Sequence, residues 1–269
     1  MSAQLSASIK RIKAVIYRHY AYMRRTPLQL LDMIIGPSMG ILVWGFMSQY
    51  FRQISIDPSA NQVPLQIIIS GYLLWEILIR SQSYILKSHM EDVLAKNLGY
   101  LLVSPLTDSE LGISYIILSF LMTVASITPA AINASKIFLD VYISIIGIII
   151  AVMILVLLGW SIGTLISSAV FRFGRPAEIL NGLVIVGLAP ISCVFYPISI
   201  LPTPLSLIAR ITPTANVFEA LREASNSYDR FLSHIVTASI GTFLLSLLSS
   251  AVFIYSCRNY RLSGRALCQ

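Results

Sequence analysis

Six long runs of this chain contain no Asp, Glu, Lys or Arg, and they limit its possible folds more than any other feature. A helix needs about 20 mainly apolar residues to cross the hydrocarbon core of a bilayer, where it satisfies its own backbone polar groups. Every run is near or above that length, so we predict an all-α integral membrane protein with six transmembrane helices. The uncharged runs lie at residues 33–51, 58–75, 111–135, 141–171, 179–209 and 231–257.

The composition excludes a soluble globular domain. Hydrophobic residues make up 56% of the chain and charged residues 12%, whereas about 25% of the residues of a typical soluble domain are charged. The net charge of +7 would also suit a nucleic-acid partner, but the basic residues cluster at the ends of the apolar runs and in the loops. Membrane topology explains that distribution, so we expect membrane lipid and no nucleic acid among the partners.

The fifth run contains four prolines, which one straight helix cannot all accommodate. They are Pro190, Pro197, Pro202 and Pro204. We therefore predict that the fifth span ends near residue 195, and that a re-entrant segment and surface helices at the outer face follow it. The predicted six-span domain covers residues 30–257, with spans at about 30–51, 64–86, 109–132, 141–171, 178–195 and 231–257, and the outer segment at 196–230.

The distribution of basic residues predicts the orientation. If the N-terminus is cytosolic, most of the 19 Lys and Arg residues lie on the cytosolic side, as the positive-inside rule requires. Both termini, including a tail at residues 258–269, are then cytosolic. We expect no signal peptide, because the N-terminal stretch lacks an apolar core.

Residues 1–29 are predicted to be an amphipathic interface helix and its lead-in. Leu5, Ile9, Ile12 and Ile16 recur at helical spacing, with basic residues between them. Such a helix lies along the membrane surface with its bases toward anionic headgroups. The alternative is a mobile basic tail.

The loop between the second and third spans contains a second amphipathic segment, at residues 87–104. Pro105 ends this predicted helix, and Thr107 and Glu110 have the spacing of a capping box that opens the third span. Such a rigid turn can transmit a displacement of the surface helix to the membrane helix that follows. A surface helix that only covers the ends of the spans would give the same sequence pattern. Its apolar stripe consists of Met90, Val93, Leu94, Leu98 and Leu101.

The sequence contains no motif for chemistry of its own. GxxxxGK[ST], HExxH and CxxC are all missing, and the three cysteines have no metal-like spacing. We expect His19, His89 and His234 to lie apart, with no pair of them sharing a site with a carboxylate. The chain is therefore predicted not to be an enzyme and to bind no cofactor or metal, so any motor must be a separate chain.

Charged groups at membrane depth are functional candidates, and the second span contains Glu76 and Arg80. They are four residues apart and can pair along one helical face. Two interpretations stay open for the pair, a structural ion pair or part of a cytosolic substrate entrance. Tyr72 and Trp75 are deeper and can contact substrate or form apolar walls. The candidate substrate path is thus Tyr72, Trp75, Glu76 and Arg80.

Gly159, Gly163 and Ser167 form a ladder of small residues on the fourth span. Small residues at this spacing allow two membrane helices to approach closely. The ladder serves packing within one subunit or the seam between two copies.

Two stretches resemble the type-two permease family of ATP-binding-cassette (ABC) exporters. The first is LLVSPL at residues 101–106, and the second is the stretch at 195–223. In that family a helix before an LLxxP turn contacts the ATPase, and a proline pattern forms the outer re-entrant region. This chain differs from the usual family sequence at residues 96–100. It matches the outer pattern at Phe195, Pro197, Pro202, Pro213, Glu219 and Arg222.

The resemblance implies an export machine in the cell inner (cytoplasmic) membrane. Two copies of this chain would assemble with two ATP-binding subunits, which bind the ATP and Mg. It further implies a small export permease whose substrate is a glycoconjugate, a polysaccharide or an amphipathic drug; the aromatic rings favour a lipid-linked glycan. The implied ATPase-contacting residues are Met90, Val93, Leu94, Asn97, Leu98 and Leu101.

Other functions stay open at this point. The same machine could export hydrophobic drugs or lipids. Alternatives of another class are a secondary transporter, in which Glu76 would carry a proton, and an intramembrane lipid-modifying enzyme.

Overall fold

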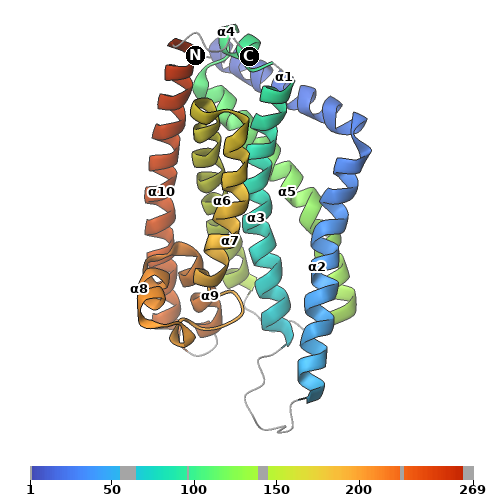
Figure 1. Cartoon of the computed structure of the whole chain (residues 1–269), viewed down its shortest axis with the longest axis vertical. Coiled ribbons are helices and arrows are strands. Elements are labelled where there is room, and N and C mark those ends of the chain that lie inside the picture. Colours follow the sequence, from blue (N-terminus) through green and yellow to red (C-terminus); the bar gives the residue numbers. More distant parts are fainter. Residues whose placement is uncertain (1, 55–64, 96, 139–144, 225–226, 263–269) are drawn as a thin grey trace.

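Helices account for nearly all of the residues that the computed structural model describes, which are 2–54, 65–95, 97–138, 145–224 and 227–262 (Figure 1). No strand occurs among them, so the predicted all-α class is confirmed for this part of the chain. The helices are α1 Ser2–Arg25, α2 Pro27–Ile54, α3 Leu65–Leu94, α4 Leu98–Val103, α5 Asp108–Phe138, α6 Ile145–Phe173, α7 Ile179–Ile191, α8 Thr203–Ile211, α9 Pro213–Glu223 and α10 Tyr228–Leu262, with short 3₁₀ helices at Arg175–Glu178 and Ile198–Ile200.

Helices α2, α3, α5, α6, α7 and α10 lie side by side, and the other helices lie at the two ends of the bundle (Figure 1). Helix α1 lies across one end, together with α4 and the last turns of α10; we call this the α4 end. Helices α8 and α9 lie at the opposite end, which we call the α9 end. The start of α1 and the end of α10 are therefore at the same end of the bundle.

Four helices in the described part of the chain are long and apolar enough to cross a membrane. Their spanning segments are Pro27–Met47, Asp108–Ala134, Ile146–Phe173 and Tyr228–Leu262. Helix α3 has 30 residues, but its charged and polar side chains lower its mean hydropathy. It tolerates them because it packs against α2, α5 and α6 at the centre of the bundle. Helix α7 has only 13 residues.

The boundary between α3 and α4 differs from the prediction. Helix α3 continues to Leu94, and the helix expected over 87–104 is therefore two elements, the last turns of α3 and the six-residue α4. Nothing in residues 87–94 breaks a helix, and their apolar stripe continues the buried face of α3. Parts of the predicted spans and of the predicted tail lie outside the described residues, namely 64, 141–144 and 263–269.

The glycine ladder of α6 packs against α3 within the chain. A Cβ atom on Gly159 would lie 2.0 Å from the Ser81 Oγ and 2.8 Å from the Leu78 carbonyl oxygen, and one on Gly163 would lie 2.5 Å from the Gln82 carbonyl oxygen. Only glycine permits so close an approach of two backbones. For these two residues, the prediction of packing within one subunit is confirmed.

A tight turn follows α7 at the α9 end of the bundle. Arg222 of α9 donates hydrogen bonds from Nη2 to the carbonyl oxygens of Cys193 and Val194. The Ile198 amide donates to the Glu219 Oε1 over 2.6 Å. Cys193 adopts a left-handed backbone conformation, with φ of 52°. Helix α9, which is mostly buried, thus fixes the path of the chain after α7.

Candidate functional site at the α4 end

Helix α4, which lies between α3 and α5 in the sequence, exposes apolar side chains at this end of the bundle. Tyr100 and Val103 are each 81% exposed, and Leu94, at the end of α3, is 50% exposed. Exposed apolar side chains at an end of a membrane protein, away from the lipid-facing sides, are typical of a contact surface for another protein. We call Leu94, Tyr100 and Val103 the α4 patch.

The turn from α4 into α5 is held by the predicted capping box. The Thr107 amide donates to the Glu110 Oε2 over 3.0 Å, and the Glu110 amide donates to the Thr107 Oγ1 over 3.3 Å. Two backbone N–H groups at the start of α5 are satisfied in this way. The capping box is therefore confirmed, and Leu106 beside it is buried in the core.

Glu110 also connects the start of α5 to the interface helix α1. The Arg11 Nε donates to Oε2 over 2.9 Å, and the Arg11 Nη2 donates to Oε1 over 2.5 Å. A guanidinium that binds a carboxylate with two parallel bonds fixes direction as well as distance. A movement of the α4–α5 turn would consequently be coupled to α1.

Asp108 makes the equivalent connection to α10. The Arg261 Nη2 lies 2.8 Å from the Asp108 Oδ1 and donates to the Leu106 carbonyl oxygen over 3.0 Å. The Cys257 thiol donates to the same Asp108 oxygen over 3.2 Å. The α4–α5 turn is thus bound to both α1 and α10.

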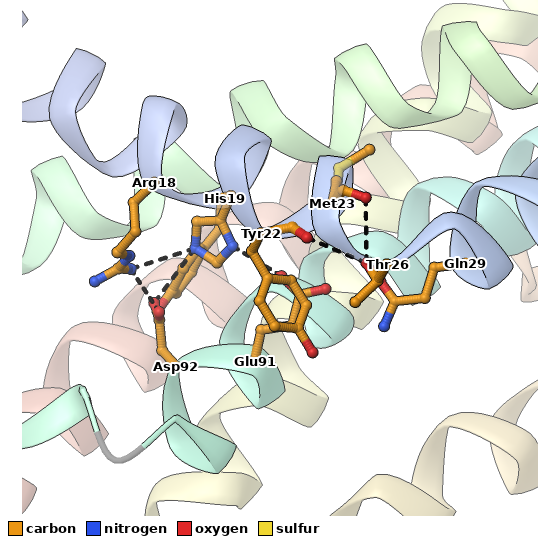
Figure 2. Close-up of polar contacts among 9 residues, drawn as sticks. Arg18, His19, Tyr22, Met23, Thr26, Gln29, Glu91 and Asp92 are labelled. Carbon is orange, nitrogen blue, oxygen red and sulfur yellow. Dashed lines mark hydrogen bonds and ion pairs between the residues drawn. The ribbon is translucent and has the colours of Figure 1, made fainter.

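A buried cluster ties α1 to the end of α3, just before α4 (Figure 2). The Arg18 Nη2 donates to the Asp92 Oδ1 over 2.5 Å, and the His19 Nδ1 lies 2.9 Å from the Glu91 Oε2. The Tyr115 hydroxyl of α5 donates to the other Asp92 oxygen over 2.8 Å. Three helices therefore meet at two adjacent carboxylates.

The cluster favours the protonated form of His19. Burial acts against the imidazolium, but the hydrogen bonds with Asp92 and Glu91 outweigh it, so the pKa of His19 is raised above its ordinary value of 6.5. The charged form therefore strengthens the link between α1 and α3.

The expectation that the three histidines lie apart is wrong for His19 and His89, which contact the same Tyr115 ring, although of these two only His19 contacts a carboxylate of the described residues. The His89 ring stacks on Tyr115, with ring centroids 5.7 Å apart, and lies 4.5 Å from Phe171. His19 meets the edge of the same Tyr115 ring. His89 is completely buried, and neither ring nitrogen has a hydrogen-bond partner among the described residues. Long-range packing, which a single sequence does not reveal, places both histidines against one tyrosine.

The predicted contact residues are divided between the interior and the surface. Met90 is only 4% exposed and packs inside the bundle, so it is not available to a partner. Val93 and Leu101 are partly buried against the core. Leu94 is exposed and Asn97 is half-buried, whereas the Leu98 side chain lies outside the described residues. The sequence interpretation missed Tyr100 and Val103, whose spacing of three residues on α4 would have been a signal.

Three of the four predicted substrate-path residues form one polar row on α3. The Arg80 Nε donates to the Glu76 Oε2 over 2.9 Å, and the Tyr72 hydroxyl donates to the Glu76 Oε1 over 2.8 Å. The predicted Glu76–Arg80 pair is confirmed. Trp75 is elsewhere, in the core between α3 and α6. The row lies against Gly36 and Gly40 of α2, where side chains would collide with it.

A polar contact beside this row connects α3 to α7. The Gln82 Nε2 donates to the Asn181 Oδ1 over 3.0 Å, and the Asn181 Nδ2 donates to the Ser83 Oγ over 3.1 Å. Such amide and hydroxyl bonds hold membrane helices together. They fix the short α7 against the centre of the bundle.

An apolar groove of about 480 Å³ opens between α3, α5 and α6. Ile77, Phe120 and Val156 contribute to its lining, as does Thr123, whose buried hydroxyl has no partner among the described residues. The described residues contain no group of three or more His, Cys, Asp or Glu side chains that could hold a metal ion.

Comparisons with known proteins do not assign this chain to a family. No protein-family model matches it, and no curated protein matches it. The functional argument therefore depends on its own residues.

Proposed function

We propose that this chain is the transmembrane permease subunit of an ABC exporter. The observation that carries the proposal is the α4 patch: a short helix at one end of the bundle exposes apolar side chains, and ion pairs bind the end of α3 before it and the start of α5 after it to α1 and α10. Two copies of the chain would assemble with two ATP-binding subunits, which would dock on the α4 patch. ATP and Mg would be bound by those subunits, and this chain would have no enzymatic activity of its own.

The contacts at the α4 end suit the transmission of force. A displacement of α4 would reach α5 through Pro105 and the capping box, because Glu110 and Thr107 hold the turn rigid. Arg11 and Arg261 would carry the same displacement to α1 and α10. The motion of a bound ATPase would in this way reorient several membrane helices together.

The α9 end supports the proposed topology. If α3 and α7 also enter the membrane, the chain has six spans, with the α4 end cytosolic and the α9 end outside. The short α7 and the turn that Glu219 and Arg222 hold would then form the re-entrant outer segment, and α8 and α9 would be its surface helices. The same Glu and Arg belong to the motif on which the family resemblance depends.

For the substrate we propose a lipid-linked glycoconjugate or polysaccharide that crosses the inner membrane. Tyr72, Glu76 and Arg80 supply hydroxyl, carboxylate and guanidinium groups at membrane depth, and these are the groups that bind sugar hydroxyls and phosphate. All three are now occupied with one another. A substrate would gain access to them only if α2 moved away from α3.

The groove between α3, α5 and α6 favours a second candidate substrate, a hydrophobic drug or lipid. Its lining is almost entirely apolar. The groove is accessible from the side of the bundle, where such a molecule would already be dissolved in the bilayer. Substrate-stimulated ATPase assays of the reconstituted complex would separate the two candidates.

The alternatives of another class have less support. Both Glu76 oxygens are bonded, one to Tyr72 and one to Arg80, which leaves this carboxylate poorly suited to carry a proton for a secondary transporter. A lipid-modifying enzyme needs catalytic groups beside a substrate cavity. The His19–Asp92 cluster lies instead in the packed junction of α1, α3 and α5.

Co-purification tests the proposal. The chain would be expressed with the ATP-binding subunit encoded beside it and extracted in detergent. Tyr100→Asp combined with Val103→Asp should abolish recovery of that subunit, because both side chains are exposed on α4. Ile211→Asp on α8 is the matched control, because Ile211 is 78% exposed at the opposite end.

The outcomes are distinguishable. Met90→Asp should lower the yield of folded protein, because that side chain is buried, whereas the α4 double variant should insert normally. If wild-type protein never recovers an ATP-binding subunit, the exporter proposal fails. If the double variant still recovers it, the docking surface lies elsewhere.

A further inference from the structure

A second apolar groove lies under the interface helix, at the α4 end of the bundle. Its volume is about 500 Å³, and residues of α1, α2 and α5 line it. Met33, Leu121 and Met122 form part of its interior, and Lys13, Tyr17 and Tyr20 come from α1. Sites for small organic ligands have volumes of about 300–1,000 Å³, so the groove is large enough for one.

The lining indicates the chemistry of the ligand. Among the described residues that line the groove, Lys13 alone is charged, and the rest of the wall is almost entirely apolar. Hydrocarbon fits such an interior, because burying polar groups there would leave them without hydrogen bonds. The ammonium of Lys13 and the phenols of Tyr17 and Tyr20 suit the level of lipid headgroups.

The bases of α1 are divided into two sets. Arg11 and Arg18 are used in ion pairs with Glu110 and Asp92 of the bundle. Lys13 is exposed, and no acidic side chain of the described residues forms an ion pair with it. Its charge is therefore available to an anion at the mouth of the groove. Figure 1 shows α1 lying across the end of the bundle.

We propose that this groove binds one anionic phospholipid of the adjacent leaflet, with an acyl chain between α1, α2 and α5 and the phosphate at Lys13. The occupant is identified by charge complementarity and by the apolar interior together. The lipid would fill the space between α1 and the bundle on the side of α1 away from the ion pairs of Arg11 and Arg18. This site requires only that the chain is embedded in a membrane, and it does not depend on the export function.

Lipid retention tests the site. The full chain would be reconstituted in nanodiscs with equal amounts of phosphatidylglycerol and phosphatidylcholine, released into mild detergent, and weighed by native mass spectrometry. Wild-type protein should retain one phosphatidylglycerol. Ala125→Trp should abolish retention, because Ala125 lines the groove. Lys13→Gln should keep a lipid but lower the preference for phosphatidylglycerol about fivefold, since one base near anionic lipid is worth about 1 kcal/mol.

Two matched variants separate this site from general lipid binding. Ala251→Trp places the same side chain on the exposed face of α10, and Lys10→Gln removes a base of α1 that does not line the groove. Both should retain lipid as the wild type does. Leu121→Phe carries the test if Ala125→Trp does not fold.

Several results would overturn the proposal. Equal retention of both lipids by the wild type would make the groove a nonspecific apolar surface. Unchanged retention in Ala125→Trp or Leu121→Phe would place the lipid elsewhere. A cysteine cross-link from position 17 to a second copy of the chain would show that a protein, and not a lipid, covers the groove.

Discussion

Gly40 of α2 is in direct contact with the phenol of Tyr72 on α3. A Cβ atom at position 40 would lie 1.7 Å from the Tyr72 oxygen and 2.3 Å from the ring carbon that bears it. That oxygen donates its hydrogen bond to Glu76, which in turn binds Arg80. The absence of a side chain on α2 therefore allows the whole polar row of α3 to form.

The first prediction follows from this contact. Gly40→Ala should destabilise the fold by about 1–3 kcal/mol, because the buried phenol must turn away and release Glu76. Gly187→Ala on α7 is the control, since a Cβ there would meet nothing within 4 Å. Unfolding in mixed micelles measures both. Equal stability of the two variants would mean that Tyr72 has a second, equally good position.

The second prediction separates the two functions of Glu110. Glu110→Gln keeps an acceptor for the capping box but loses the charge that binds Arg11, whereas Glu110→Ala loses both. Stability should fall in the order wild type, Gln, Ala. The hydrogen bond from the Thr107 amide contributes about 0.5–1.5 kcal/mol, and the ion pair contributes less because the Arg11 side chain is partly exposed. Thermal unfolding in detergent measures the order, with Glu178→Ala, an exposed residue after α6, as control.

The third prediction concerns pH. The raised pKa of His19 means that folding favours its protonated form. This contribution to stability is complete below the unfolded pKa of about 6.5, and it is lost as the pH rises through the higher folded pKa. The Tm of the wild type should fall over that interval relative to His19→Gln. Parallel curves of Tm against pH for the two proteins would contradict the inference that folding favours protonated His19.

The fourth prediction concerns the turn after α7. Arg222→Met removes the donors to the Cys193 and Val194 carbonyl oxygens, and each buried acceptor left unpaired costs about 1–3 kcal/mol. Cys193 is completely buried, so opening of the turn should accelerate its reaction with a maleimide, located by mass spectrometry. Arg210→Met, on the exposed side of α8, should leave the rate unchanged. A slow reaction in Arg222→Met would show that α9 holds the turn without this side chain.

Local patterns predicted the parts of this molecule that depend on neighbours in the sequence. The capping box joins residues three apart, and the Glu76–Arg80 pair joins residues four apart, so helical geometry alone places the partners together. The apolar runs likewise predicted the helical class. Their periodicity did not predict that α3 continues to Leu94, because the same stripe suits a surface helix or a longer span.

The cluster that joins α1, α3 and α5 could not be predicted from the sequence. His19 and Glu91 are 72 residues apart, and Arg11 and Glu110 are 99 apart. Each base of α1 has several carboxylates at the same end of the bundle as potential partners. The choice among them depends on how the helices pack, and spacing within one chain does not encode it.

The length of α7 has a consequence for the surrounding lipid. Its 13 residues span about 20 Å at 1.5 Å per residue, whereas the hydrocarbon core of a bilayer is about 30 Å thick. If α7 crosses the membrane, as the proposed six-span topology requires, the lipid chains beside it must compress or tilt. Such hydrophobic mismatch costs fractions of a kcal/mol per Å. With that topology the protein would thin the membrane locally along this face, and it should be more stable in bilayers of shorter lipids.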